Sequence, residues 1–375
     1  MVTFAHISDT HLGYRQFNLE ERENDFYEVF SEAVDKIIEK KVDFVVHSGD
    51  LFEHFKSPPR TLLNAIENLR KLKEENIPIY SIPGNHDIIM RRGAIPPQAL
   101  LSYFGVTLLG GIRNYIEHDG IFVGGIRYLS KYYSAALLDQ INELSDKAEA
   151  YEKRILLLHE AVDRFLPFNF ELQFDDLPRN FDYLAMGHIH KRIKAELGRG
   201  ILAYAGSTEV WRSDEVSSFE KLGKGINIID LDKKPPTIQI VDLETIRPFY
   251  KVEISTEDFD EELEKILKKI EQSKKKEPIA IIKIHGKGMD AVTYNRILEE
   301  SLGALTLTYR VNFELTPESY EPVSIESLNF EDLFQKSIED SSKAKFAYEL
   351  FKLLSVGDTE QAIKFSETFF EEEWE

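Results

Sequence analysis

Five apolar, β-rich runs of this sequence each end in a short polar cluster, and this recurrence constrains the fold more than any other feature. The clusters are Asp9 and His11 after VTFAHIS, Asp50 after VDFVVHSG, Asn85, His86 and Asp87 after IPIYSIPG, His159 after ILLL, and His188 and His190 after DYLAMG. Open α/β folds place their active sites at the carboxyl ends of strands. Asp, Asn and His are ligands of divalent metals. We therefore expect a metal site where these strand ends meet.

The order of the predicted elements indicates an α/β fold. Apolar residues recur at helical spacing over residues 18–41, 58–76 and, in a shorter helix, 95–105, with buried-type strands between these segments. Such a βαβαβ order favours a parallel sheet with helices on its faces. Short strands and Gly turns follow from residue 106 onward. The whole pattern predicts a two-sheet sandwich flanked by helices.

Two boundaries divide the chain into three predicted domains. They fall near Ile246–Pro248 and Thr316–Pro322, and they separate residues 1–246, a compact α+β segment over 247–318, and a helical tail over 319–375. The tail has many aromatic side chains and is too short to bury them alone. We therefore expect it to bind a partner.

Composition excludes several classes of protein. The chain has no cysteine, which rules out disulfides, thiolate zinc sites and cysteine nucleophiles. No apolar run approaches transmembrane length, and the stretch MVTFAHISD lacks the basic region of a signal peptide. We expect a cytoplasmic location and no membrane association.

The formal net charge of -20 complicates any nucleic-acid function, because phosphate binding normally needs a basic surface. Either the substrate is not a nucleic acid, or bound metals, local Lys/Arg clusters and a partner overcome the net field.

Each polar cluster is weak evidence by itself. Asp9 and His11 are two residues apart, as are His188 and His190, so the members of each pair point the same way in an extended chain. Taken alone, Asp50 is better explained as a helix N-cap, and the GNHD tetrapeptide could be only a turn. The occurrence of all five clusters in this order predicts a dinuclear metallophosphoesterase.

The same motifs resemble those of the calcineurin-like metallophosphoesterases. Within them, the chain is similar to the nuclease subunit of the double-strand-break repair complex, the meiotic-recombination-eleven/SbcD family, in its archaeal branch. The stretch HISDTHLGYRQFNLEERENDF carries most of this resemblance, with GDLF, PGNHD, GHIHK and the later GSTE. The motifs cover about residues 2–212. Beyond them only the layout is similar, with a small cap domain and then a helical region that binds an ATPase.

The resemblance implies two Mn²⁺ ions per subunit, with Mg²⁺ as the weaker alternative. It assigns one ion to Asp9, His11, Asp50 and His190, and the other to Asp50, Asn85, His159 and His188. Oxygen and nitrogen ligands without thiolates suit Mn²⁺. The implied activity is two-metal phosphodiester hydrolysis, as a double-strand exonuclease and single-strand endonuclease in DNA double-strand-break repair. Such a protein would be associated with the nucleoid.

His86 is the candidate that protonates or stabilises the departing sugar oxygen. The family often has a histidine three residues after the shared Asp50, whereas this chain has Glu53 there and His54 next. Glu53 could orient His86, as an acidic residue does in related phosphatases. Alternatively, His54 could take the usual role after a shift of one residue.

The predicted DNA contacts flank the ligands. They are Tyr14, Arg15, Gln16, Arg91, Arg92 and Lys191. Polar and basic side chains of this kind bind phosphates, although solvated surface charges explain them nearly as well.

Two surfaces are predicted to bind protein partners. Helices near residues 59–75 and 95–104 carry leucines on more than one face, which indicates either core packing or a homodimer bundle of the kind that the family uses. The candidate partner-binding residues of the tail are Phe330, Leu333, Phe334, Phe346, Leu350 and Phe351. By resemblance, their partner is a coiled-coil ABC-type ATPase.

Two other functions compete with a DNA nuclease. The first is another dinuclear metal phosphodiesterase or phosphatase, but protein Ser/Thr phosphatases carry GD-x-x-D-R-G and GNHE where this chain has GDLFEHF and GNHD. The second is a mainly structural DNA-end tether, which the intact ligand set disfavours as the sole role.

Overall fold

The computed structural model describes residues 2–89, 94–272, 276–287, 290–316, 330–338, 340–355 and 359–372. The chain divides into two compact units, residues 1–315 and residues 316–375. The predicted boundary near residue 246 falls inside the first unit, between two strands, and the one at residue 318 lies outside the described residues. The division into three domains therefore stays a prediction.

Two six-stranded sheets form the body of the first unit. The first sheet has the order β12-β11-β1-β2-β3-β4, with β1 at Thr3–Ile7, β2 at Phe44–His47, β3 at Ile79–Ser81, β4 at Val106–Leu108, β11 at Gly225–Asp230 and β12 at Thr237–Asp242. The second has the order β5-β6-β7-β8-β10-β9, with β5 at Tyr115–His118, β6 at Ile121–Gly125, β7 at Lys153–His159, β8 at Tyr183–Gly187, β9 at Ile193–Leu197 and β10 at Gly200–Tyr204. β1 to β4 are parallel to one another, as are β6, β7, β8 and β10.

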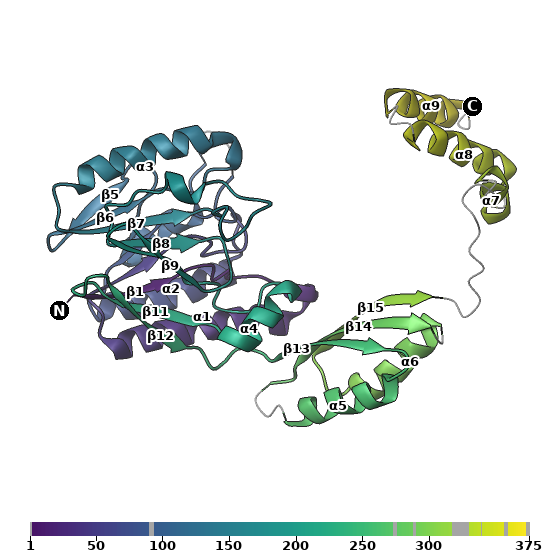
Figure 1. Cartoon of the computed structure of the whole chain (residues 1–375), viewed down its shortest axis with the longest axis horizontal. Helices are drawn as coiled ribbons and strands as arrows, with labels where there is room; N and C mark the ends of the chain where they lie inside the picture. Colours follow the sequence, from purple (N-terminus) through teal and green to yellow (C-terminus); the bar gives the residue numbers. More distant parts are fainter. Residues whose placement is uncertain are drawn as a thin grey trace. The chain divides into compact units, whose positions relative to one another are not determined.

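The two sheets pack face to face, and helices cover their outer faces (Figure 1). In β1, Phe4 packs between the sheets, whereas Ala5 and Ile7 pack on the helix side, because successive strand residues point to opposite faces. The helices α1 (Glu20–Lys40) and α2 (Pro59–Glu74) cover the first sheet, and α3 (Ser134–Ala148) covers the second. The predicted two-sheet sandwich with flanking helices is confirmed.

Shorter helices join these elements. They are η1 at Gln16–Asn18, η2 at Pro97–Phe104, η3 at Lys131–Tyr133, η4 at Phe174–Asp176, η5 at Ser213–Glu215 and α4 at Val216–Leu222. The short helix predicted over residues 95–105 is thus a 3₁₀ helix, η2. Prolines occupy its start, and Gly105 ends it in a left-handed conformation.

A smaller α+β segment completes the first unit. It contains β13 (Phe249–Ser255), α5 (Phe259–Gln272), β14 (Ile279–Lys287), α6 (Ala291–Leu302) and β15 (Thr308–Thr316). Its sheet has the order β13-β14-β15, and it has its own apolar core, to which both helices contribute. The strands and helices of the predicted cap segment therefore follow one another in the expected order.

The second unit is helical, with α7 (Phe330–Ser337), α8 (Ser341–Ser355) and α9 (Thr359–Glu372). Aromatic rings join these helices. The ring centroids of Phe330 and Phe334 in α7 lie 5.4 and 5.8 Å from that of Phe351 in α8. The ring centroid of Phe346 in α8 lies 4.0 Å from that of Phe369 in α9. In the part of the chain that the structure describes, no helix is long and apolar enough to span a membrane.

Candidate metal centre

The predicted ligands all lie at, or just beyond, the carboxyl ends of parallel strands. Asp9 and His11 follow β1, Asp50 follows β2 and Asn85 follows β3 in the first sheet. In the second sheet, His159 ends β7, and His188 and His190 follow β8. Because the two sheets pack face to face, loops from both reach the same place. The expected convergence of the strand ends is what the structure shows.

Four of these ligand residues have a backbone conformation that side chains rarely adopt. The φ angles of Asp9, His11, Asp50 and His188 are 51°, 44°, 53° and 84°. Left-handed backbone of this kind costs energy for residues other than glycine. The turn at Gly84 is equally constrained, since a Cβ atom there would overlap the backbone and carboxylate of Asp50.

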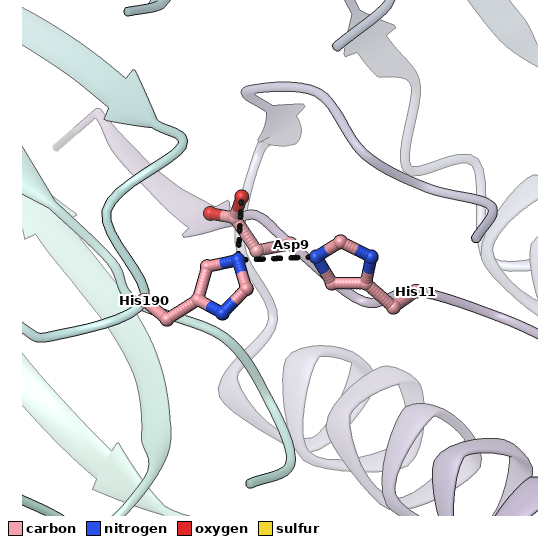
Figure 2. Close-up of side chains that lie close together, drawn as sticks. All are labelled: Asp9, His11 and His190. Carbon is pink, nitrogen blue, oxygen red and sulfur yellow. Dashed lines mark hydrogen bonds and ion pairs between the residues drawn. The ribbon is translucent and has the colours of Figure 1, made fainter. Parts of the chain in front are cut away.

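Asp9, His11 and His190 form the first ligand cluster (Figure 2). The Nε2 atoms of His11 and His190 lie 3.1 Å apart, and Nε2 of His190 lies 3.8 Å from Oδ1 of Asp9. Oδ2 of Asp9 is buried and has no hydrogen-bond partner among the described residues. Buried polar atoms normally have a partner, so this carboxylate oxygen fits the role of a cation ligand.

The second cluster lies around His159. Its Nε2 atom is 3.1 Å from both Oδ2 of Asp50 and Oδ1 of Asn85, and Nδ1 of His188 is 2.9 Å from the same Asn85 oxygen. Oδ2 of Asp50 also lies 3.9 Å from Nε2 of His11 in the first cluster. Asp50 is therefore within reach of both clusters, as a bridging ligand must be.

The electrostatics of the site fit divalent metal ions. The carboxylates of Asp9 and Asp50 are buried together. Burial alone would lower the pKa of His159, but the adjacent Asp50 raises it to about 10. The buried carboxylates thus favour positive charge at this place, because buried negative charge needs a compensating cation. The donor set of carboxylates, imidazoles and one amide suits a first-row divalent metal.

Carboxylates orient two of the imidazoles from behind. Nδ1 of His11 lies 2.8 Å from Oε2 of Glu53, and Nδ1 of His190 lies 2.8 Å from Oε1 of Glu215. Each contact directs the other ring nitrogen into the site and raises its basicity. Burial would raise the pKa of Glu215, but Lys224, 2.6 Å away, and His190 hold it well below its ordinary value.

A backbone carbonyl orients His159 instead. Its Nδ1 atom donates to the oxygen of Ser48 at 2.7 Å. His188, in contrast, is held through its ring face, since the Tyr128 ring stacks on it with centroids 5.7 Å apart. The two clusters therefore differ in what supports them.

His86 lies beside the site and is partly exposed, with 24% of its side chain accessible. Its backbone N–H donates to Oδ1 of Asp50 at 2.8 Å, and its Nδ1 atom lies 2.9 Å from the backbone oxygen of Glu53. The Glu53 carboxylate is 3.6 Å from the same nitrogen. The His54 side chain is exposed. Of the two alternatives, the structure brings Glu53, not His54, to His86.

Asp87 holds the loops together rather than facing the clusters. Its carboxylate accepts hydrogen bonds from the backbone N–H groups of Gly84, Leu51 and Phe52. This ties the loop after β3 to the loop after β2.

Sequence reasoning missed several residues that support the site, namely Trp211, Glu215, Lys224 and Tyr128. The Trp211 ring stacks on His11 with centroids 5.0 Å apart, and its indole N–H donates to Glu53 at 2.9 Å. Trp211 and Glu215 lie close after the GSTE motif, and this proximity was the one available signal.

The predicted DNA contacts have different environments. Arg15 and Lys191 are exposed, Tyr14 is half-buried, and Arg91 and Arg92 lie outside the described residues. Gln16 is buried, with its amide nitrogen donating to the backbone oxygen of Trp211 and its amide oxygen accepting from Arg22. Both ends of the Gln16 amide are therefore already bonded within the protein.

Apolar side chains are exposed on both predicted partner surfaces. On α2 and around η2 these are Leu63, Ile95, Leu100 and Tyr103. In the tail, Phe330, Leu333 and Phe351 are exposed, whereas Phe334, Phe346 and Leu350 are half-buried.

The fold and the site agree with the comparisons to known proteins. Residues 2–192 match the family model of the calcineurin-like phosphoesterases, and a metal-dependent phosphoesterase is the class of protein that the two-sheet fold and its clustered ligands define.

The full-length relatives are more specific. The chain is 37% identical to the DNA double-strand break repair protein Mre11 of Methanococcus maripaludis, in an alignment of 375 positions that covers 98% of this chain and 98% of the relative. It is 37% identical to that of Thermoplasma acidophilum, over 75% of this chain and 76% of the relative. It is 40% identical to that of Methanocaldococcus jannaschii, over 70% and 72%. The chain belongs to the Mre11 family, and the family predicted from the motifs is confirmed.

Proposed function

We propose that this protein is a Mn²⁺-dependent DNA nuclease, a double-strand exonuclease and single-strand endonuclease that acts in DNA double-strand-break repair. The observation that carries the proposal is the pair of ligand clusters that share Asp50, with His86 beside them. The names of the relatives support DNA repair as its setting.

Two metal ions would be held by the two clusters. Asp9, His11, Asp50 and His190 would bind one ion, and Asp50, Asn85, His159 and His188 would bind the other. When bound, such a pair polarises a phosphodiester and activates water for attack on phosphorus. The share of imidazole among these ligands favours Mn²⁺ over Mg²⁺, which prefers oxygen ligands and bound water.

His86 would supply the proton to the leaving oxygen. The backbone oxygen of Glu53 can only accept a hydrogen bond, so Nδ1 of His86 must carry the hydrogen and donate this hydrogen bond. The second ring nitrogen is then the one that gains and loses a proton. Glu53 has the further role of orienting His11.

The substrate and partner assignments rest on exposed surfaces. Arg15 and Lys191 are exposed beside the ligand loops and are the DNA contacts that we favour. The exposed apolar residues of α2 and η2 support a homodimer, and those of α7 and α8 support binding of a coiled-coil ABC-type ATPase. Such a complex would be associated with the nucleoid.

Cleavage of end-labelled double- and single-stranded DNA tests the proposal, in Mn²⁺, Mg²⁺ or EDTA. We expect cleavage in Mn²⁺, little in Mg²⁺ and none in EDTA. His86→Ala should abolish cleavage, whereas His285→Ala, a matched change at an exposed cap residue, should not. A comparison of Glu53→Gln with His54→Ala tests on which of the two residues the site depends, through His86 or His11, and only the first should lower activity.

Two results would favour the competing functions. Hydrolysis of a generic phosphodiester without DNA cleavage in any metal would indicate a small-molecule phosphodiesterase. An Asp50→Ala variant that retains full repair function in cells would indicate a DNA-end tether.

A further inference from the structure

Trp211 lies against three imidazoles of the site. Its ring stacks on His11 with an interplanar angle of 24°, and it meets His86 and His190 edge-on at centroid distances of 5.5 and 5.0 Å. The indole N–H donates to Oε2 of Glu53 at 2.9 Å, the oxygen that also contacts Nδ1 of His11. Trp211 therefore constrains both the His11 ring and the carboxylate that orients it.

Gln16 fixes the backbone of Trp211 from the other side. The amide nitrogen of Gln16 donates to the Trp211 backbone oxygen at 2.8 Å, and its amide oxygen accepts from Nε of Arg22 at 2.8 Å. Nη2 of Arg22 donates to the backbone oxygen of Val210, the residue before Trp211, at 2.9 Å. Gln16 and Arg22 are buried, so water does not readily replace these bonds.

Asp25 of α1 connects the same network to the start of the cap segment. Nη1 of Arg22 lies 2.6 Å from Oδ2 of Asp25. Arg247, two residues before β13, contacts both oxygens of that carboxylate at 2.6 and 3.0 Å. Lys276, three residues before β14, lies 2.8 Å from Oδ1. One buried carboxylate thus binds a cation from each of the two segments that lead into the cap sheet.

A purely packing role would not need this pattern. A phenylalanine could fill the space over His11, but it would leave the Glu53 oxygen with one donor fewer. Charge-assisted and bidentate bonds also fix direction more strictly than apolar contact does. The bonds run without interruption from Arg247 through Asp25, Arg22, Gln16 and Trp211 to Glu53.

We propose that Trp211 is a positioning residue, which transmits the placement of the Arg22–Asp25–Arg247 network at the cap boundary to the imidazoles of His11 and His86. Trp211 acts through Glu53 and does not touch the reacting atoms. The catalytic part of the inference rests on the proposed nuclease function, whereas its metal-binding part does not.

Trp211→Phe is the central test, because it keeps an aromatic ring beside His11 and removes the N–H donor together with the five-membered ring of the indole. Loss of partners that orient metal ligands typically costs about 10–100-fold in metal affinity or activity. We expect Trp211→Phe to lower kcat on DNA about 10-fold with KM unchanged, and to weaken Mn²⁺ binding in calorimetry to a similar extent. Trp211→Ala should lower both kcat and Mn²⁺ affinity further.

Gln16→Glu tests the link to the cap boundary. It keeps an acceptor for Arg22 and removes the donor to Trp211, and Gln140→Glu is the matched control, because Gln140 donates to Ala136 of its own helix. Gln16→Glu should lower kcat and Mn²⁺ affinity, and the Trp211→Phe/Gln16→Glu double variant should lose little more than the worse single variant. Such non-additivity is the sign of a shared path.

Thermal unfolding of each variant shows whether it is folded. The inference is overturned if folded Trp211→Phe keeps wild-type kcat and Mn²⁺ affinity, or if the losses of the two single variants multiply. Should the wild-type protein cleave no DNA, the proposed function fails, and calorimetry still decides whether Trp211 positions the metal ligands.

Discussion

The two ligand clusters are supported in different ways. In the first, His11 and His190 each have a carboxylate behind the ring, Glu53 and Glu215. In the second, the backbone carbonyl of Ser48 supports His159, and a side-chain substitution does not remove a backbone carbonyl. Carboxylates make an imidazole a more basic ligand than carbonyls do. The first cluster should therefore bind metal more tightly, and the second should exchange it more readily.

Loss of the shared carboxylate should have the largest effect, because Asp50 serves both clusters. We expect Asp50→Asn to lower activity by more than about 100-fold, the upper range for residues that only orient ligands. Calorimetry should also show weakened binding at both metal sites. If only one site weakens, Asp50 does not bridge.

Glu215→Gln should affect one cluster and spare the other. It removes the charge behind His190 and leaves the buried Lys224 without its ion pair. We expect one Mn²⁺ affinity to fall by about 10–100-fold while the other stays within error. Glu196→Gln, an exposed change on β9, serves as the control.

Metal titration of the wild-type protein compares the clusters directly. After metal removal with EDTA and dialysis, Mn²⁺ should bind in two steps whose affinities differ by about 10-fold, the lower end of the effect of such orienting partners. A single step with two equivalent sites would contradict the distinction between the clusters.

Tyr128→Phe should have the smallest effect. It keeps the ring that stacks on His188 and removes a long hydroxyl contact of 3.4 Å to Glu171. A bond this long falls at the low end of the range for hydrogen bonds, about 0.5 kcal/mol, so activity should fall roughly 2-fold. A much larger loss would show that the second cluster also depends on hydrogen bonds behind its ligands.

The convergence of the candidate ligands could be predicted from the sequence because each one lies next to the strand that delivers it. Asp9 and His159 need only a strand end and the rule that such ends converge. The sandwich followed in the same way from the periodicity of its strands and helices. These signals depend only on residues that are close together along the chain, so they can be recognised in a single sequence.

The supporting residues could not be predicted, because their partners lie far away along the chain. Trp211 donates to a residue 158 positions earlier, and Glu215 contacts His190 across 25 positions. Nothing in the residues around Gln16 indicated that its amide would be buried between Trp211 and Arg22. Only the folded chain brings such groups together.

The left-handed backbone at Asp9, His11, Asp50 and His188 has a consequence for how this protein tolerates mutation. Glycine adopts that conformation without strain, whereas β-branched residues do so at the greatest cost. A scan of cellular abundance should therefore rank glycine above valine and isoleucine at all four positions, although every such variant loses a ligand. At these positions selection for activity and selection for a stable fold favour different residues, so selection for stability without selection for activity would favour glycine there.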